Sequence, residues 1–343
     1  MYPIDNMDSK RSQVQPSKIL RGARYCFAGV IGAALASTML MSPAVAQEYP
    51  TQSVSIVVPF NVGGPTDLLG RVIANALSEK LGQPFVIDNR PGATGAIGGT
   101  YAATADPDGY TLLLGSNSVN GTNEMLRPES TPYRTEEAFQ AIALLTRTPF
   151  GLVVHENLGV STLEEFLELA KASPGDLTYS TTGIGGTAHF ASELLNIRAG
   201  IDTVHIPFTG GGPMMQALLA GTVDFTIGGM TGLSDGMIPL AVLWDERLPH
   251  MPDVPTMAER GINDIEYYAW FGLFAPKDTP ADVIAKLEAS VLEVANDPAV
   301  LKQLVDLGFE PTVEGREGLE RQVRDSMAKS AAVLAENPDL IGQ

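Results

Sequence analysis

The stretch that decides the fold is Ser53-Val54-Ser55-Ile56-Val57-Val58-Pro59-Phe60-Asn61-Val62-Gly63-Gly64-Pro65-Thr66-Asp67. It begins as a short apolar run rich in β-branched residues, which predicts a strand, and it breaks at Pro59 into a glycine-containing loop. A helical pattern then begins at Thr66 or Asp67 and stops at Gly82. We expect the N–H groups of the loop and the positive end of the helix dipole to face one spot, which suits an anion without any Lys or Arg.

A plain tight connection is the alternative to an anion site, because glycine-rich turns between a strand and a helix are common in α/β proteins. The loop is not a phosphate loop of the GxxxxGK[ST] kind, since no Lys follows the glycines, and it contains no GxGxxG. The same construction recurs downstream, where residues 177–180 lead into the glycine loop 181–187 and residues 204–208 lead into 209–213. This recurrence favours the anion site.

Strand-like and helix-like segments alternate along the chain from Gln47 onward. This order predicts an α/β fold with a parallel sheet, whose ligand sites lie beyond the carboxyl ends of the strands. Besides the strands already named, we expect strands at residues 85–87, 110–114, 150–154, 223–227, 240–243 and 267–275.

The first 46 residues have the pattern of a secretory signal peptide. Five basic residues precede an apolar segment from about Cys26 to Met41, which ends in Ala44-Val45-Ala46 before Gln47. The segment is interrupted by small and polar residues and is short for a membrane span, so a retained anchor is the less favoured alternative. Cleavage near Ala46 predicts a periplasmic protein without cysteine, because Cys26 is the only one in the chain.

The balance of charges excludes some partners. The chain carries a formal charge of −18, and loss of residues 1–46 removes five basic and two acidic residues, which leaves −21. Such acidity argues against nucleic acid and against anionic membrane surfaces as partners. A small anionic ligand remains compatible with it, because backbone amides act locally.

An ordered set of motifs along the chain resembles the periplasmic solute receptors of tripartite tricarboxylate transporters, the TctC or Bug-type family. No single motif is decisive, but together they span nearly all of residues 49–340. The motifs are Val58-Pro59-Phe60 with Gly63-Gly64-Pro65-Thr66-Asp67, Leu81-Gly82-Gln83-Pro84, Asn89-Arg90-Pro91-Gly92-Ala93, Ala105-Asp106-Pro107-Asp108-Gly109-Tyr110-Thr111-Leu112-Leu113, Gly183-Ile184-Gly185-Gly186-Thr187-Ala188-His189, His205-Ile206-Pro207-Phe208, Gly221-Thr222-Val223-Asp224, Asp253-Val254-Pro255-Thr256 and Trp270-Phe271-Gly272-Leu273-Phe274-Ala275-Pro276.

The resemblance implies a two-lobed periplasmic-binding-protein fold of type II, a Venus flytrap with a ligand cleft between its lobes. Lobe 1 is expected to comprise residues 47–147 plus 271–343, and lobe 2 residues 148–270. The resemblance also implies that loops 60–66 and 183–187 hold a ligand carboxylate between them, partly through ordered water. A non-catalytic receptor of this kind binds a di- or tricarboxylate or an aromatic carboxylate and delivers it to membrane permease subunits. We expect a monomer without a cofactor.

Two departures from the family pattern concern the second lobe. Relatives often carry Asp-Asn where this chain has Gly228-Gly229, so a carboxylate that would pair with a ligand amine is missing. Relatives also carry a helix and a basic turn where only residues 230–239 remain here. An amino-acid ligand is therefore disfavoured, and the far rim of this lobe is left open.

The candidate ligand-binding residues follow from the loops and from the ends of the strands. Each has a structural alternative: Asp67 as a first-turn acid favoured by the helix dipole, His189 as packing between lobes, the asparagines and Ser116 as turn residues, and the phenylalanines as core. The predicted set is Phe60, Asn61, Val62, Gly63, Gly64, Thr66, Asp67, Asn89, Ser116, Asn117, Thr148, Thr182, Gly183, Ile184, Gly185, Gly186, Thr187, His189 and Phe208.

An enzyme is the rival class. The sequence contains no GxSxG elbow, and the mature chain would have no cysteine nucleophile. The four histidines lack the HExxH spacing or another close metal-site pattern, so we predict neither catalytic residues nor a metal. The glycine loops leave one alternative open, a secreted α/β enzyme that acts on a phosphate- or carboxylate-bearing small molecule.

Overall fold

The strand, loop and helix of the opening stretch form the centre of the first lobe. A computed structural model describes residues 49–230, 233–336 and 338; the predicted signal peptide lies outside the described residues. Strand β1 (Val54–Val58) lies between β2 (Phe85–Asn89) and β3 (Thr111–Ser116) and is parallel to both. Helix α2 (Pro65–Leu81) follows the β1 loop, as the sequence predicts.

The first lobe is built on two apolar clusters. Val54, Ile56 and Leu69 contribute to the larger cluster, on which α9 (Ala281–Ala295) and α10 (Pro298–Asp306) also pack. The smaller cluster surrounds Trp270, whose side chain is fully buried. The short elements of this lobe are η1 (Ala93–Gly95), α3 (Ala96–Ala103), η2 (Ser118–Thr122), α4 (Asn123–Leu126), α5 (Thr135–Ala138) and β10 (Pro311–Gly315).

The second lobe has its own sheet and core. Strand β5 (Thr178–Thr181) is parallel to β6 (Val204–Pro207) and to β7 (Phe225–Gly229), while β8 (Met237–Val242) is antiparallel to β4 (Phe139–His155). Phe166, Tyr179, Phe190 and Phe225 fill its main cluster. The helices are α6 (Leu163–Ala172), α7 (Thr187–Ala199) and α8 (Gly211–Leu219), with short turns η3 (Glu156–Leu158) and η4 (Ala258–Arg260).

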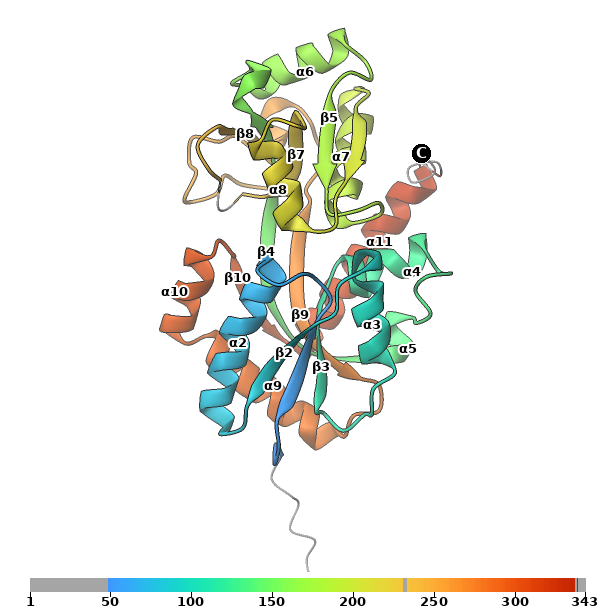
Figure 1. The fold of residues 1–343 in the computed structure, drawn as a ribbon, viewed down its shortest axis with the longest axis vertical. Helices are drawn as coiled ribbons and strands as arrows, with labels where there is room; N and C mark the ends of the chain where they lie inside the picture. The colour runs from blue at the N-terminus through green and yellow to red at the C-terminus, as the bar shows by residue number, and fades with distance from the viewer. Residues whose placement is uncertain (1–48, 231–232, 337, 339–343) are drawn as a thin grey trace, which may run out of the picture. The chain divides into compact units, whose positions relative to one another are not determined.

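Two long strands connect the lobes, and Figure 1 shows them side by side. Strand β4 (Phe139–His155) pairs antiparallel with β9 (Tyr268–Pro276) and then with β7. Because β4 is one strand of 17 residues, the predicted start of a new strand at Phe150 is wrong. Pro149 lies where β4 passes from β9 to β7, so its missing N–H does not end the strand.

The C-terminal helix α11 (Arg316–Glu336) contributes to both cores. Leu319 and Val323 belong to the cluster around Trp270, and Val333 belongs to the main cluster of the second lobe. The fold is therefore α/β and two-lobed, as predicted, but the predicted parallel sheet is wrong in part, because β4 and β9 pair antiparallel with their neighbours. The predicted boundaries, residues 47–147 plus 271–343 and residues 148–270, stay a prediction. No helix among the described residues is both long enough and apolar enough to span a membrane.

Candidate functional site

Helices α2, α7 and α8 begin around one cavity. The residues that precede them are Gly64, Gly186 and Gly210, and no side chain caps any of these three described helix starts. The first N–H groups of a helix have no partner within the helix, and here no capping side chain takes them up. The positive ends of three helix dipoles therefore lie at the cavity wall.

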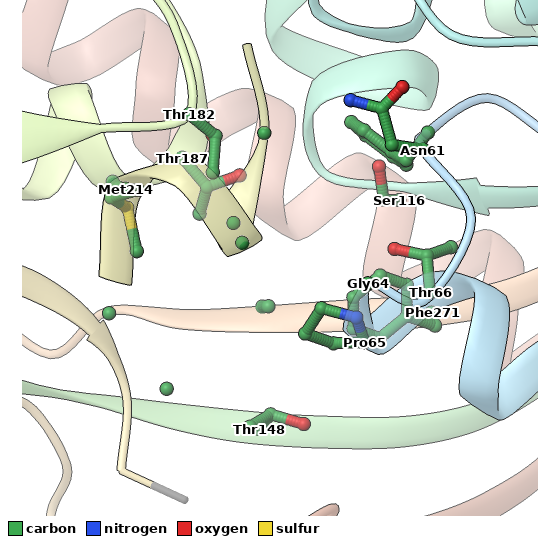
Figure 2. A pocket seen from close by; sticks show the side chains of 18 of the residues that line it. Asn61, Gly64, Pro65, Thr66, Ser116, Thr148, Thr182, Thr187, Met214 and Phe271 are labelled. Atoms are coloured by element: carbon green, nitrogen blue, oxygen red, sulfur yellow. The ribbon is translucent and has the colours of Figure 1, made fainter. Parts of the chain in front are cut away.

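The cavity has a volume of about 290 Å³. Figure 2 shows part of its wall, with Asn61, Gly64, Pro65 and Thr66 on one side and Thr182, Thr187 and Met214 on the other. Among the described residues that line it, none carries a formal charge. The lining consists of Phe60, Asn61, Val62, Gly63, Gly64, Pro65, Thr66, Ser116, Asn117, Ser118, Thr148, Phe150, Thr182, Thr187, Ala188, Gly210, Gly211, Gly212, Pro213, Met214, Gly228, Gly229, Ala269, Phe271, Leu307, Gly308 and Phe309.

Two buried hydroxyl groups of the wall lack a partner. The Oγ of Ser116 and the Oγ1 of Thr148 form no hydrogen bond within the described residues, although both side chains are buried. An unpaired buried hydroxyl is costly, so these two atoms are suited to a polar group of a ligand. Together with the helix starts they make the wall, as far as the structure describes it, a donor-rich surface without a cation.

The buried carboxylate of Asp67, a residue that is 1% exposed, fixes the loop between β1 and α2. Its carboxylate accepts hydrogen bonds from the Gly63 N–H at 2.9 Å, from Arg71 Nε at 2.9 Å and from Asn89 Nδ2 at 3.0 Å. Asn89 also donates to the carbonyl oxygen of Phe60 at 3.2 Å. Burial acts to raise the pKa of Asp67, but these hydrogen bonds outweigh it and hold the pKa below its usual value. Asp67 and Asn89 thus position the loop and do not line the cavity.

The second glycine loop is held by His189 in a similar way. Its Nδ1 accepts the N–H of Gly185 at 2.9 Å, and its ring stacks on His205 with 4.0 Å between centroids. His205 Nε2 lies 2.6 Å from Thr181 Oγ1, and the Tyr179 ring also stacks on His205, with 5.0 Å between centroids. His189 is therefore buried behind the loop and does not line the cavity.

Burial lowers the pKa of both stacked histidines. The pKa of His189 falls to about 3, to which the charges of His205 and Arg127 also contribute, and burial lowers the pKa of His205 to about 4. Both rings are thus neutral in the folded protein near neutral pH. The unfolded chain takes up their protons near pH 6.5.

Acid should therefore destabilise the folded protein before its carboxylates titrate. Because the unfolded chain binds more protons, the free energy of unfolding should fall as the pH drops through the window from about 6.5 to about 3–4, by about 2 kcal/mol for His189 alone at about pH 5. Urea unfolding between about pH 7 and pH 5 measures this. His205→Gln should flatten this dependence. Equal slopes in the variant and in the unaltered protein would contradict the assignment.

Loop residues from the two lobes also meet at the rim of the cavity. Asn61 Nδ2 donates to the carbonyl oxygen of Thr209 at 2.7 Å, and the hydroxyls of Ser118 and Thr187 lie 3.3 Å apart. On the neighbouring side, Arg127 donates to the Ile184 carbonyl oxygen and to Thr94 Oγ1. Arg127 thus lines an adjoining pocket and does not line the cavity.

The structure brings most of the predicted site residues together. Those that line the cavity are Phe60, Asn61, Val62, Gly63, Gly64, Thr66, Ser116, Asn117, Thr148, Thr182 and Thr187. Those that line only the adjoining pocket are Gly183, Ile184 and Phe208. Those outside both linings are Asp67, Asn89, Gly185, Gly186 and His189.

Sequence reasoning missed part of the wall. The turn 209–213 was found as the third glycine loop but was not assigned to the site, although Gly210 to Gly212 line it. Phe271 and Gly228 lie on strands that only the tertiary fold brings to the cavity. Residues 307–309 follow α10 and carry no motif that marks them. Among the described residues, no cluster of histidine, cysteine or acidic side chains is suited to hold a metal ion.

Comparison with known families decides the class. The family model described as "Tripartite tricarboxylate transporter family receptor" matches residues 69–338. The chain belongs to this family of receptors. Its members are solute-binding receptors, so the family gives no support to the enzyme alternative.

Individual relatives of this receptor agree with the family model. Protein BugT of Bordetella pertussis is 33% identical over 312 residues, which cover 90% of this chain and 96% of BugT. A solved R. palustris protein with adipate is 32% identical, with a TM-score of 0.81 and coverage of 84% of this chain and 98% of that one. MatC from Rhodopseudomonas palustris with bound malate is 33% identical, with a TM-score of 0.78 and coverage of 83% and 100%.

Proposed function

We propose that this receptor binds a small organic carboxylate in the cavity where α2, α7 and α8 begin. The observation that carries the proposal is the combination of three uncapped helix starts with a lining that has no charged residue among those described. Such a wall offers hydrogen-bond donors and the positive ends of helix dipoles, and it offers an anion no repelling carboxylate.

The donors for the carboxylate come from named groups. They are the N–H groups of Thr66 in α2, of Thr187 and Ala188 in α7, and of Gly211 and Gly212 in α8. Proline has no N–H, so Pro65 in α2 and Pro213 in α8 donate nothing. Hydrogen bonds from neutral donors to an ionised acceptor are roughly twice as strong as neutral pairs. The unpartnered hydroxyls of Ser116 and Thr148 add donors from the first lobe and from β4.

The acidity of the whole chain does not oppose this site. The acidic side chains whose partners are known from the structure are engaged elsewhere, as Asp67 is with Arg71 and Asp88 with Arg90. Charges in water are screened within about 8–10 Å at ordinary salt, whereas the helix starts contact the cavity directly. The adipate and malate found in solved relatives are carboxylates too, which supports the same ligand class here.

Ligand binding should stabilise the folded receptor. Protein that has been unfolded, dialysed and refolded to remove any retained ligand is expected to melt at a higher temperature with some members of a carboxylate panel. A ligand at about 100 times its Kd adds about 2.7 kcal/mol to the free energy of unfolding. The neutral amides of the same acids and inorganic phosphate serve as controls. Millimolar carboxylates without any shift, on protein shown to be ligand-free, would contradict the proposal.

We further propose that the receptor works in the periplasm as a monomer and delivers its ligand to the permease subunits of a tripartite transporter. Export by residues 1–46 is the basis, and these residues lie outside the described part of the structure. Protein recovered from an exporting bacterial host should begin at or near Gln47 and should be released with the periplasmic fraction. N-terminal sequencing of that fraction checks this, and a membrane-bound product with residues 1–46 intact would contradict it.

A further inference from the structure

The walls of the cavity differ in chemistry. The uncapped helix starts and the hydroxyls of Ser116 and Thr148 supply its polar groups. Most of the remaining lining is hydrocarbon, and two of its rings, Phe271 and Phe309, pack edge to face with centroids 6.0 Å apart. The apolar part of the wall consists of Phe150, Met214, Ala269, Phe271, Leu307 and Phe309.

Helix α8 belongs to the polar part. A Cβ placed on Gly211 would lie 3.7 Å from Pro65 Cδ, and Asn61 donates to the carbonyl oxygen of Thr209 just before the helix. The N-terminus of α8 therefore lies directly against the loop that leads into α2. Its N–H groups join the donor cluster of α2 and do not form a separate anion site at the apolar wall.

Gly228 and Gly229 leave space at the cavity wall, and the backbone does not require glycine at either position. Neither has a positive φ. A Cβ on Gly228 would lie 3.5 Å from Met214 Cε, and a Cβ on Gly229 would lie 3.8 Å from Thr148 Cγ2, which are ordinary contacts. Since neither backbone strain nor crowding excludes a side chain, the two glycines widen the cavity beside Met214.

Among the described residues, no cation faces this widened apolar part. The lining described above contains no Lys, Arg or His, and Arg127 at the adjoining pocket is bonded to Ile184 and Thr94. A second ligand carboxylate that reached the apolar wall would lose its water without gaining a cationic partner, which is far more costly than the loss of a methylene contact. A hydrocarbon body there would instead be covered by Phe150, Met214 and Phe271.

We propose that this receptor prefers a monocarboxylate with an uncharged, apolar body of ring or short-chain size, and that Met214, Gly228 and Gly229 set this preference. The inference rests on the proposed carboxylate site and narrows its ligand class. This preference would distinguish the receptor from the relatives solved with adipate and with malate, because both of those ligands are dicarboxylates.

The test compares ligands that differ in one charge. Hexanoate and adipate share a six-carbon chain, and phenylacetate presents a ring; each is titrated into the refolded, ligand-free full-length mature protein by calorimetry. Hexanoate and phenylacetate should bind at least about tenfold more tightly than adipate. Tighter binding of adipate would overturn this inference and leave the carboxylate site standing. Binding of none of the three, with no melting shift from any carboxylate, would overturn both.

Two variants test the assigned wall. Met214→Lys places a cation on the apolar side and should shift the ratio of hexanoate to adipate affinity at least about tenfold toward adipate. Gln303→Lys, on the exposed side of α10, adds the same charge outside the cavity and should leave the ratio unchanged. Gly228→Val should weaken the binding of phenylacetate several-fold more than the binding of acetate, because acetate is too small to reach the apolar part of the cavity. An unchanged ratio in Met214→Lys, or equal losses for both ligands in Gly228→Val, would overturn the assignment.

Discussion

Gly64→Val and Gly212→Val are each expected to weaken carboxylate binding by about 10- to 150-fold. Gly64 precedes α2 with φ −77° and ψ 167°, which valine adopts without strain, and a Cβ there would lie 3.4 Å from the Asn61 carbonyl oxygen. Gly212 is the second residue of α8, and a Cβ there would meet nothing within 4 Å. Both side chains would occupy the space through which an anion reaches the helix N–H groups. Loss of one charge-assisted hydrogen bond costs about 1.5–3 kcal/mol, and steric exclusion adds to it.

Arginine variants provide the contrast for these glycine variants. Arg127 is bonded to Ile184 and Thr94, and Arg90 pairs with Asp88 at 2.7 Å and lies over the Tyr101 ring. Arg127→Ala and Arg90→Ala should therefore weaken binding less than either valine does. Calorimetric titration of each variant, with unchanged far-UV circular dichroism, makes the comparison. If an arginine variant abolishes binding while both glycine variants retain it, the carboxylate is held by a salt bridge and not by amides.

Asp67→Ala is expected to lower the free energy of unfolding by about 3 kcal/mol and to weaken ligand binding as well. The buried carboxylate holds Gly63 and Asn89, and both donors would be left without their acceptor, at about 1–3 kcal/mol each. The loop 60–66 would then lose its fixed position at the cavity. Urea unfolding with an unchanged m-value measures the stability, and titration measures the affinity.

Arg71→Ala is the matched control for Asp67→Ala. The Arg71 side chain is 48% exposed and lies 2.9 Å from Asp67, so its removal breaks the ion pair but leaves the other hydrogen bonds of Asp67 in place. Exposed ion pairs contribute about 0–1 kcal/mol. Asp67→Asn should lie between the two, because the amide nitrogen that replaces one carboxylate oxygen would face either the donor of Asn89 or those of Gly63 and Arg71. A loss in Asp67→Ala no larger than in Arg71→Ala would show that the loop does not depend on the buried carboxylate.

Local pattern was sufficient for those parts of the fold that local sequence determines. The β1 run, its glycine loop and α2 lie within residues 53–81, and the apolar spacing and the breakers mark each boundary. The sequence pattern does not predict the continuity of β4, because Arg147, Thr148 and Pro149 interrupt its apolar run. Pairing with β9 and then with β7 keeps that segment extended, and pairing between distant strands leaves no local mark on the sequence.

The candidate site divides in the same way. Loop residues such as Gly64 and Thr187 were predicted because a strand end and a helix start adjoin in the sequence. Spacing alone does not show whether a side chain next to a loop faces the cavity or the protein interior. Asp67 and His189 accept hydrogen bonds from their loops on the side away from the cavity. Phe309 is the lining residue that the sequence pattern marks least, because it follows α10 and lies far along the chain from the predicted loops.

The paired strands β4 and β9 form one wall of the cavity and also connect the two lobes. Thr148 and Phe150 on β4, and Ala269 and Phe271 on β9, line the cavity on the same two strands that pass from one lobe to the other. A paired ribbon bends and twists more readily than its strands slide past each other, because sliding would break every ladder hydrogen bond. Any change in the angle between the lobes therefore deforms the surface on which the ligand lies. A bulkier ligand body is therefore expected to require a different bend of these two strands.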